Sequence, residues 1–348
     1  MNQTQWEQLL AVVAGQAVDP LPVGFVIDSP WLPPWAGIST LDYYASESKW
    51  LEANLQVVRG FPEVCFLPGF WSEYGMCTEP SAFGARCVWH ENELPFADKT
   101  VASDEGLVTA DAMAKVPRPD PRTDGLLPLV LKRLVHARPA IEAEGHAIRF
   151  AVARGPLNIA SFLLGTTELM MALRLESDAC HGLLRTITDF LVDWLRLQKQ
   201  AIDSIDGIFL LDDLVGFLGE DDYQAFAAPY LKQSFAAFDA KVRFFHNDAN
   251  GSVCAPHLAE AGVNLFNFGF EHSLADMRRW LGPGVAMLGN IPPRDVLARG
   301  TPDDVRAAVR TAMDGLEGKR GLMLSCGGGV PPGVSTENMR AFVDEARQ

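Results

Sequence analysis

Short apolar runs alternate along the chain with longer stretches whose apolar residues recur at helical spacing. Eight of these runs have the length and composition of strands. They are almost continuously apolar, which suits a parallel sheet covered on both faces. We expect the eight strands at Pro22–Asp28, Glu63–Gly69, Ala147–Arg154, Gly207–Asp213, Val242–Asp248, Val263–Gly269, Val285–Ile291 and Gly321–Gly327.

The stretches between the runs read as helices. Thr301-Pro302-Asp303-Asp304 shows a typical start, with a capping side chain, a first-turn proline and acidic residues near the helix amino end. We expect helices at Trp6–Ala14, Leu41–Arg59, Leu126–Glu144, Glu168–Ile205, Asp221–Ala240, Cys254–Ala261, Ser273–Leu281, Pro302–Glu317 and Ser335–Arg347. Eight β/α units in this order predict an α/β fold of the (β/α)8 TIM-barrel class, as a single domain over residues 1–348.

Residues 71–120 do not follow this alternation. They are rich in turn-forming residues, tryptophan, proline and charge. We therefore expect an insertion after the second strand that folds over the mouth of the barrel as a lid.

Composition narrows the choice of partners and compartment. The formal net charge is −15, from 29 basic and 44 acidic residues, and no basic cluster reverses it locally, which argues against binding to nucleic acid or to an anionic membrane. No apolar run reaches the roughly 18 residues of a membrane span, and the first residues lack the pattern of a secretion signal. The 6 cysteines form no CxxC pair, which fits a reducing compartment. We expect a cytoplasmic protein.

Polar or reactive residues stand at the ends of nearly all the predicted strands. The carboxyl ends of barrel strands are where active sites are built. Mutual pairing or helix capping would explain any one of these residues, but explains the whole set less well. The residues are Asp28, Arg154, Asp212, Asp213, His246, Asp248, Asn267, Glu271, Asn290 and Cys326.

Three of these residues form a candidate metal set. His246 and Asp248 are two residues apart, so their side chains leave the same side of an extended chain. Cys326 comes from a distant strand and joins them only if the sheet closes. An imidazole, a carboxylate and a thiolate are all accepted by a catalytic zinc site, which needs about three protein donors and one open position. Taken singly, His246 also reads as an ordinary rim histidine and Cys326 as a small buried apolar residue.

Several segments taken together resemble the uroporphyrinogen decarboxylase superfamily over most of the chain, and this resemblance implies the same (β/α)8 fold. The segments are Gly155–Ser161, Ile208–Leu218 followed by Tyr223–Phe226 and Pro229-Tyr230, Gly289–Pro293, Gly300–Pro302, and Gly327–Gly333 followed by Ser335–Met339.

The superfamily contains two chemistries. Its decarboxylases carry an arginine-rich segment soon after the first strand, because a substrate with many carboxylates needs guanidinium partners. The corresponding place here reads Asp28-Ser29-Pro30-Trp31-Leu32-Pro33-Pro34-Trp35, with no arginine before Arg59. The Gly-His-Gly loop of the decarboxylases is replaced by Cys326-Gly327-Gly328-Gly329. Both departures argue against decarboxylation.

The second branch consists of zinc-dependent methyltransferases that exchange methyl groups between a corrinoid protein and an acceptor. The resemblance implies that His246 takes the position of their ligand histidine, Asp248 that of the first ligand cysteine, and Cys326 that of the last. It also implies zinc or another divalent metal, a small-molecule methyl donor or acceptor, and a corrinoid carried by a partner protein. Aspartate in place of cysteine makes the site harder and less thiophilic.

Other residues are assigned to the same site with supporting roles. We expect Asp213, Glu73 and Glu79 to serve as a fourth ligand or a proton carrier, and Asn290 to act beside them in catalysis. Substrate contacts are expected from the acidic and amide groups Asp28 and Asn267 and from an aromatic wall of Trp31, Trp35, Phe70 and Trp71.

Two alternatives stay open. One is a tetrapyrrole decarboxylase with an unusual anion site, and the other is a metal- or corrinoid-binding protein without turnover of its own. A Rossmann enzyme, a P-loop enzyme and a serine hydrolase are disfavoured, because the chain has no GxGxxG after the first strand, no GxxxxGK[ST] and no GxSxG. The fold permits either a monomer or a homodimer.

Overall fold

The computed structural model describes residues 1–103 and 106–348. Eight parallel strands form its centre, and each lies inside one of the runs predicted to be a strand. They are β1 (Gly24–Val26), β2 (Cys65–Leu67), β5 (Phe150–Arg154), β6 (Gly207–Leu211), β7 (Val242–Asn247), β8 (Leu265–Phe268), β9 (Ala286–Ile291) and β10 (Leu322–Cys326).

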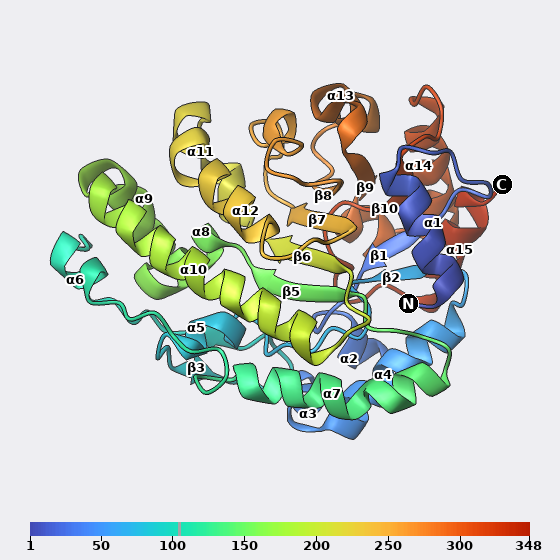
Figure 1. Cartoon of the computed structure of the whole chain (residues 1–348). Helices are drawn as coiled ribbons and strands as arrows, with labels where there is room; N and C mark the ends of the chain where they lie inside the picture. The colour runs from blue at the N-terminus through green and yellow to red at the C-terminus, as the bar shows by residue number, and fades with distance from the viewer. Residues whose placement is uncertain (104–105) are drawn as a thin grey trace.

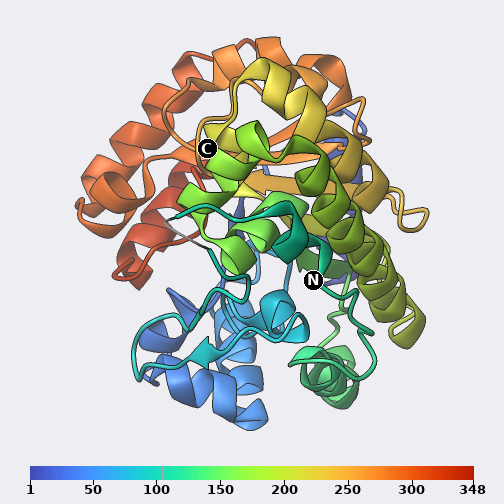
Figure 2. The same cartoon turned by 90° about the vertical axis from the view of Figure 1, so that its left-hand side faces the viewer.

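The strands are arranged in chain order. One parallel sheet has the order β10-β9-β8-β7-β6-β5, and a second pairs β1 with β2. Parallel bridges from Val23 to Leu324 and from Val26 to Gly329 join β1 to β10. Among the described residues no ladder joins β2 to β5. This order, with β10 beside β1 and helices around the strands (Figures 1 and 2), is that of a (β/α)8 barrel, and the predicted fold class is confirmed.

Most predicted helices are present, but several are divided. The helix predicted at 41–59 is two helices, because Ser46 ends the first and accepts a hydrogen bond from Lys49 N, 3.3 Å away, at the start of the second. Pro229 likewise lies in the first turn of a new helix inside the predicted 221–240. The helices of the main alternation are α1 (Gln3–Val13), α2 (Leu32–Trp35), α3 (Thr40–Ala45), α4 (Glu47–Gly60), α7 (Leu127–Ala143), α8 (Pro156–Leu164), α9 (Thr166–Leu175), α10 (Ser177–Ala201), α11 (Glu220–Phe226), α12 (Ala228–Phe235), α13 (Leu274–Leu281), α14 (Pro302–Asp314) and α15 (Thr336–Ala346).

Short helical turns complete the rim. The helix predicted at 254–261 is only a 3-10 turn over Ala255–His257. The short elements are η1 (Asp213–Phe217), η2 (Ala255–His257), η3 (Gly282–Gly284) and the π-helical η4 (Pro293–Ala298).

The insertion at 71–120 contains α5 (Thr78–Ala82), α6 (Ala110–Ala114) and an antiparallel pair, β3 (Cys87–Val88) and β4 (Phe96–Ala97). The backbone N–H groups of Thr100 and Val101 donate to Leu163 O at 3.0 and 3.1 Å. These bonds tie the insertion to the end of α8, and Figure 1 shows α5, β3 and α6 on the same lower left side of the molecule.

The strands separate two apolar clusters. Phe150, Phe209, Phe244 and Met323 belong to the cluster inside the strands, whereas the alternate strand residues pack outward against the helices. Trp6 of α1 stacks edge-on against Phe150 at 5.8 Å, so α1 covers the amino end of the barrel. Both chain ends lie at this right-hand side of Figure 1.

No single helix in the described part of the chain is long and apolar enough to cross a membrane. The bent pair of α8 and α9 passes that test on length and composition alone, with a bend of 105° between its halves.

Candidate metal centre

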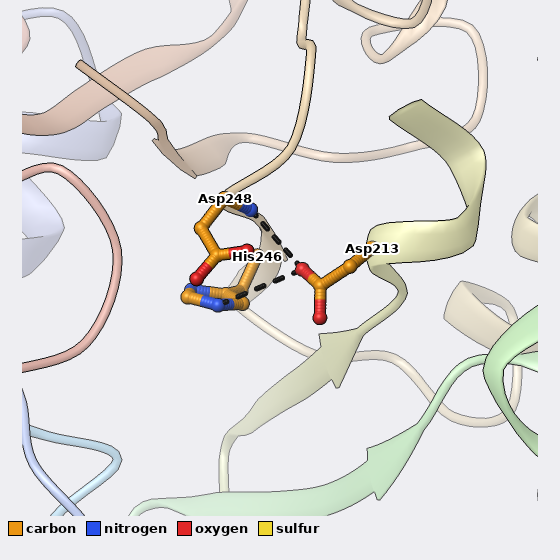
Figure 3. Close-up of side chains that lie close together, drawn as sticks. All are labelled: Asp213, His246 and Asp248. Carbon is orange, nitrogen blue, oxygen red and sulfur yellow. Dashed lines mark hydrogen bonds and ion pairs between the residues drawn. The ribbon is translucent and has the colours of Figure 1, made fainter. Parts of the chain in front are cut away.

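Asp213, His246 and Asp248 meet beyond the carboxyl ends of β6 and β7 (Figure 3). One ligand atom from each lies within 4.8 Å of the other two. His246 and Asp248 share a side of the chain because they are two residues apart, as the sequence predicts. Asp213 reaches them because β6 and β7 are neighbours in register, with Leu211 opposite His246. The three side chains therefore offer one imidazole nitrogen and carboxylate oxygens to one point.

The orientation of the His246 ring is set by Asn267 of β8. The Asn267 amide Nδ2 donates to Leu288 O at 2.8 Å and to Cys326 O at 3.4 Å, so its Oδ1 is the atom that faces His246. That oxygen lies 2.7 Å from His246 Nδ1 and can only accept. Nδ1 must then carry the proton, which leaves the lone pair of Nε2 directed toward the carboxylates. Outer groups commonly fix metal-ligating histidines in this way.

The two carboxylates are close enough to repel each other. Asp213 Oδ1 lies 3.9 Å from His246 Nε2 and accepts a hydrogen bond from the backbone N of Asp248 at 3.1 Å. Desolvation raises the pKa of Asp213, His246 lowers it, and the charge of Asp248 raises it further. A cation at this point would offset both the desolvation and the repulsion.

Cys326 is not brought to this group. Side chains alternate along β10, so Met323 belongs to the inner cluster, whereas Leu324 and Cys326 belong to the outer one. The Cys326 Sγ lies 3.4 Å from Gly328 O, and burial raises the pKa of this thiol to about 12. The structure therefore does not bring together the predicted donor set of His246, Asp248 and Cys326; it places Asp213, the predicted fourth ligand or proton carrier, beside His246 and Asp248 instead.

The three donors line a cavity of about 340 Å³ at the carboxyl end of the barrel. Its wall includes Asp28 and Trp71, two of the residues expected to contact substrate, and Met76 and Leu94 from the insertion. The remaining lining residues are Val26, Pro30, Arg154, Asn158, Phe162, Leu211, Pro293, Arg294, Gly327, Gly329, Val330, Pro331 and Pro332. The volume is at the lower end of the roughly 300–1,000 Å³ typical of small-molecule sites.

The glycines after Cys326 bring the chain close to the metal set. Gly328 has a φ of +89°, and a Cβ there would lie 3.0 Å from Asp248 Cβ. Glycine is thus required for this approach of the backbone to the site.

Arg154, at the end of β5, is buried between two carboxylates. Its Nη2 lies 3.0 Å from Glu73 Oε2 and its Nη1 lies 3.5 Å from Glu79 Oε2. Glu79 also accepts from Arg154 N at 3.2 Å, and Ser29 Oγ donates to Glu73 Oε1 at 3.2 Å. Glu73 and Glu79, predicted as ligands or proton carriers, therefore hold Arg154 in place and are not part of the metal set.

Asp28 is an acidic group of the cavity wall that resists ionisation. Burial holds its pKa well above the usual range, and the charge of nearby Glu73 raises it further, while Arg154 acts in the opposite direction. Asp28 therefore carries a proton into a pH range in which an exposed aspartate has lost it.

Asp212, the neighbour of Asp213, has a structural role. Its carboxylate accepts from Leu157 N at 2.9 Å and from Asn158 N at 3.0 Å. These are unpaired N–H groups of the first turn of α8, so Asp212 caps that helix.

Four other predicted site residues lie away from the cavity wall. Trp31 Nε1 donates to Val334 O at 3.0 Å, and Trp35 Nε1 donates to Thr336 Oγ1 at 3.1 Å, so both anchor the segment that leads into α15. Phe70 packs edge-on against His146 at 5.8 Å. Asn290 donates from Nδ2 to His272 O at 2.6 Å and so holds the loop after β8.

Some cavity residues had no role in the prediction from sequence. From the sequence, Arg154 is recognisable only as a polar strand end and Asn158 only as a member of the Gly155–Ser161 segment, whereas Phe162 and Arg294 are not predicted. Arg154 and Asn158 belong to the strand end and the helix start next to the predicted site. This closeness in the chain to the predicted site is a signal by which both residues could have been found. Phe162 and Arg294 show none, because only the path of the chain brings them to the cavity.

An α/β fold with the strand order of a barrel and a set of potential metal ligands at its carboxyl end defines the class of protein. Residues 4–348 match the family model described as Uroporphyrinogen decarboxylase (URO-D), and the chain belongs to this family.

Relatives and solved structures agree with this assignment. A uroporphyrinogen decarboxylase of Pseudoalteromonas translucida (strain TAC 125) is 22% identical over 375 residues, covering 100% of this chain and 98% of the relative. One from Chloroherpeton thalassium is 30% identical over 175 residues, or 48% of each chain. The solved structure described as a methyltransferase from Methanosarcina mazei superimposes with a TM-score of 0.80 at 19% identity, covering 97% of each chain. A B12-independent methionine synthase from Shewanella sp. W3-18-1 gives 0.60 at 12% identity, covering 94% and 95%. At these identities the two structures support the fold.

Proposed function

We propose that this protein is a methyltransferase that depends on a divalent metal, zinc first, and moves a methyl group between a small methylated substrate and a corrinoid carried by a partner protein. The observation that carries the proposal is the group of Asp213, His246 and Asp248, with the lone pair of His246 Nε2 turned toward the two carboxylates by Asn267. The similarity of fold to the methyltransferase from Methanosarcina mazei agrees with it.

The residues present fit a divalent cation. Imidazole nitrogen and carboxylate oxygen are accepted ligands of zinc, and carboxylate-rich sets also suit harder ions such as Mn²⁺. His246, Asp213 and Asp248 would hold the ion. When bound, it supplies a Lewis acid that polarises the group being attacked or lowers the pKa of a nucleophile.

Substrate size and polarity are set by the other residues of the cavity. Trp71, Met76, Leu94 and Phe162 give it an apolar side, where a small uncharged substrate can lose its contact with water. Asp28 faces the same cavity, and burial raises the pKa of its carboxyl group, which suits it to donate a proton. This combination suits removal of a methyl group from an ether or an amine.

The bond between the methyl carbon and the substrate heteroatom breaks, and the electron pair stays on the heteroatom. That heteroatom would take the proton of Asp28, and the methyl group would pass to the reduced corrinoid, which would supply the electron pair of the new bond. Asp28 is left as a carboxylate and regains its proton from water.

Decarboxylation of a tetrapyrrole, the activity named for the curated relatives, is the second candidate. The cavity opposes it through its charge. The carboxyl groups of Asp213 and Asp248 line it, and its arginines in the described chain are Arg154, which is already engaged by Glu73 and Glu79, and Arg294. A substrate with many carboxylates needs several free guanidinium partners.

The two candidates are separated by assaying both activities on the same preparation. The enzyme is stripped with a chelator, reloaded with Zn²⁺ or Mn²⁺, and mixed with chemically reduced cobalamin and a panel of small methyl ethers and methylamines. Formation of methylcobalamin is followed by its absorbance, while a parallel sample measures release of CO2 from uroporphyrinogen. We expect metal-dependent methyl transfer and no CO2 release.

His246→Ala is the decisive variant, and His257→Ala is its matched control. His257 is also a histidine near the rim, but it is paired with Glu220 at 2.7 Å and lies outside the cavity lining. We expect transfer and bound metal to be lost in His246→Ala and kept in His257→Ala. CO2 release by the wild type would overturn the proposal, and metal binding without any transfer would favour a binding protein without turnover.

A further inference from the structure

A second cavity lies at the opposite end of the barrel from the metal centre. It has a volume of about 520 Å³ and is formed where α1 and α13 end and β9 and β10 begin. Its lining residues are Ala14, Gly15, Arg278, Gly282, Pro283, Val285, Ala286, Met287, Arg320 and Gly321. The charged side chains of this wall are two arginines, in a chain whose formal net charge is −15.

The two arginines line the same cavity and are linked through the backbone. Arg278 Nη1 donates to the backbone O of Arg320 at 2.6 Å, and Arg320 Nε donates to Gly15 O at 3.2 Å. Arg278 therefore lies beside the residue that carries the second charge. Two cationic side chains on the wall of one cavity make it attractive to an anion.

Most of the donors of Arg278 have no partner. Its Nε and Nη2 are buried and form no hydrogen bond with any described residue. Neither Arg278 nor Arg320 forms an ion pair within residues 1–103 and 106–348, whereas the next residue, Arg279, pairs with Asp276 at 2.7 Å. Burial lowers the pKa of Arg278, and no neighbouring carboxylate raises it again.

Buried donors without acceptors are costly, and the cost is greater for a charged group. The guanidinium group of arginine can form two parallel hydrogen bonds with two oxygens of one phosphate or carboxylate group. Two positive charges match a dianion better than a monoanion. The remaining wall, with Pro283, Val285 and Met287, is apolar and has room for an organic group attached to that anion.

We infer that this cavity binds a small organic phosphate, with its phosphate held between Arg278 and Arg320 and its organic part against Pro283, Val285 and Met287. The site is separate from the metal centre, because it lies at the amino ends of the strands. It does not depend on the proposed methyl transfer.

The inference is tested by binding of phenyl phosphate to the purified full-length chain. Calorimetry at constant ionic strength gives the dissociation constant and the stoichiometry, with inorganic phosphate and benzoate as comparison ligands. We expect one phenyl phosphate per chain, weaker binding of inorganic phosphate, which lacks the apolar part, and weaker binding of benzoate, which carries a single charge. Removal of metal with a chelator should leave the affinity unchanged, which distinguishes this site from the metal centre.

Three variants locate the site. Arg320→Ala changes an exposed residue and should weaken binding at least about tenfold, because a charge-assisted pair of hydrogen bonds is lost. Arg278→Lys keeps the charge but not the fork and should also weaken it. Arg279→Ala, on the same helix, should bind as the wild type does.

No binding by the wild type, or equal affinity in Arg320→Ala and the wild type, would overturn the inference. Tighter binding of benzoate than of phenyl phosphate would overturn the assignment to phosphate. Circular dichroism of each variant separates a lost site from a lost fold, and Arg320→Ala keeps the test valid if Arg278→Lys does not fold.

Discussion

Strands β7 and β10 each end with a residue that can bind zinc, but the structure places these two residues on opposite faces of the barrel wall. His246 on β7 and Cys326 on β10 both follow apolar runs and both are good ligands for zinc. His246 faces the inside of the barrel, where it meets Asp213 and Asp248. Cys326 faces the surrounding helices and joins the outer apolar cluster.

The difference comes from the position of each residue in the alternation of its strand. On β10 the inward-facing residues are Met323 and Ser325, and Ser325 Oγ is buried without a partner among the described residues. A shift of one residue along the strand exchanges the two faces. The type of residue at a strand end therefore does not show whether it belongs to the site. What decides this is whether its position in the strand faces inward or outward.

Among the variants that test this difference between β7 and β10, Asn267→Leu is expected to change metal affinity the most. This change removes the acceptor that orients His246 but leaves every donor of the metal set in place. Loss of such a group typically costs about 10–100-fold in metal affinity, so we expect a loss of that size. Calorimetric titration with Zn²⁺ measures it.

The tautomer of the His246 ring distinguishes an orienting role of Asn267 from a purely structural one. Nitrogen NMR of the metal-free wild type should show His246 protonated at Nδ1, and the variant should show a mixture of the two tautomers. Unchanged tautomer and unchanged affinity in the variant would contradict the role given to Asn267.

An intermediate effect is expected from pH, through Asp28 at the end of β1. Its pKa is raised in the folded chain, so between its unfolded pKa, about 3.9, and its higher folded pKa the folded state holds more protons than the unfolded state. The free energy of unfolding therefore falls as pH rises through this range, by at most about 1.4 kcal/mol per pH unit for one group. The stabilising contribution is complete below the unfolded pKa and is lost above the folded one.

Asp28→Asn removes this titration. Urea unfolding of the metal-free protein from pH 5 to 8, a range chosen above the usual aspartate pKa of about 3.9, should show a smaller fall in the variant than in the wild type. Equal slopes in the two proteins would mean that Asp28 is ionised in the folded state and is not a proton donor in the proposed reaction.

The smallest effect is expected from Cys326→Ala. Because the thiol packs among apolar side chains away from the metal set, we expect unchanged zinc affinity and a loss of roughly 1 kcal/mol in the free energy of unfolding, as for a small core truncation. Metal titration and urea unfolding of the same sample check both parts. A drop in zinc affinity like that expected for His246→Ala would show that Cys326 reaches the metal and that the outward placement is wrong.

The strands were predictable because their signal is local. All eight runs contain a strand, since parallel strands buried on both faces are recognisable as continuous apolar segments. Helix α8 was missed for a related reason. Eight of its nine residues are buried, so it has no polar face to mark a helical period. The breaks at Ser46 and Glu176, which divide long amphipathic stretches, depend on how each half packs.

Composition and spacing within single segments were enough to predict the succession of strands along the chain, its acidic balance and the shared side of His246 and Asp248. The fold then selects among the remaining candidates: Asp213 joins His246 and Asp248, Glu73 and Glu79 pair with Arg154, and Cys326 faces outward. These outcomes depend on the phase of each strand and on contacts between residues far apart in the chain. No local pattern records either of them.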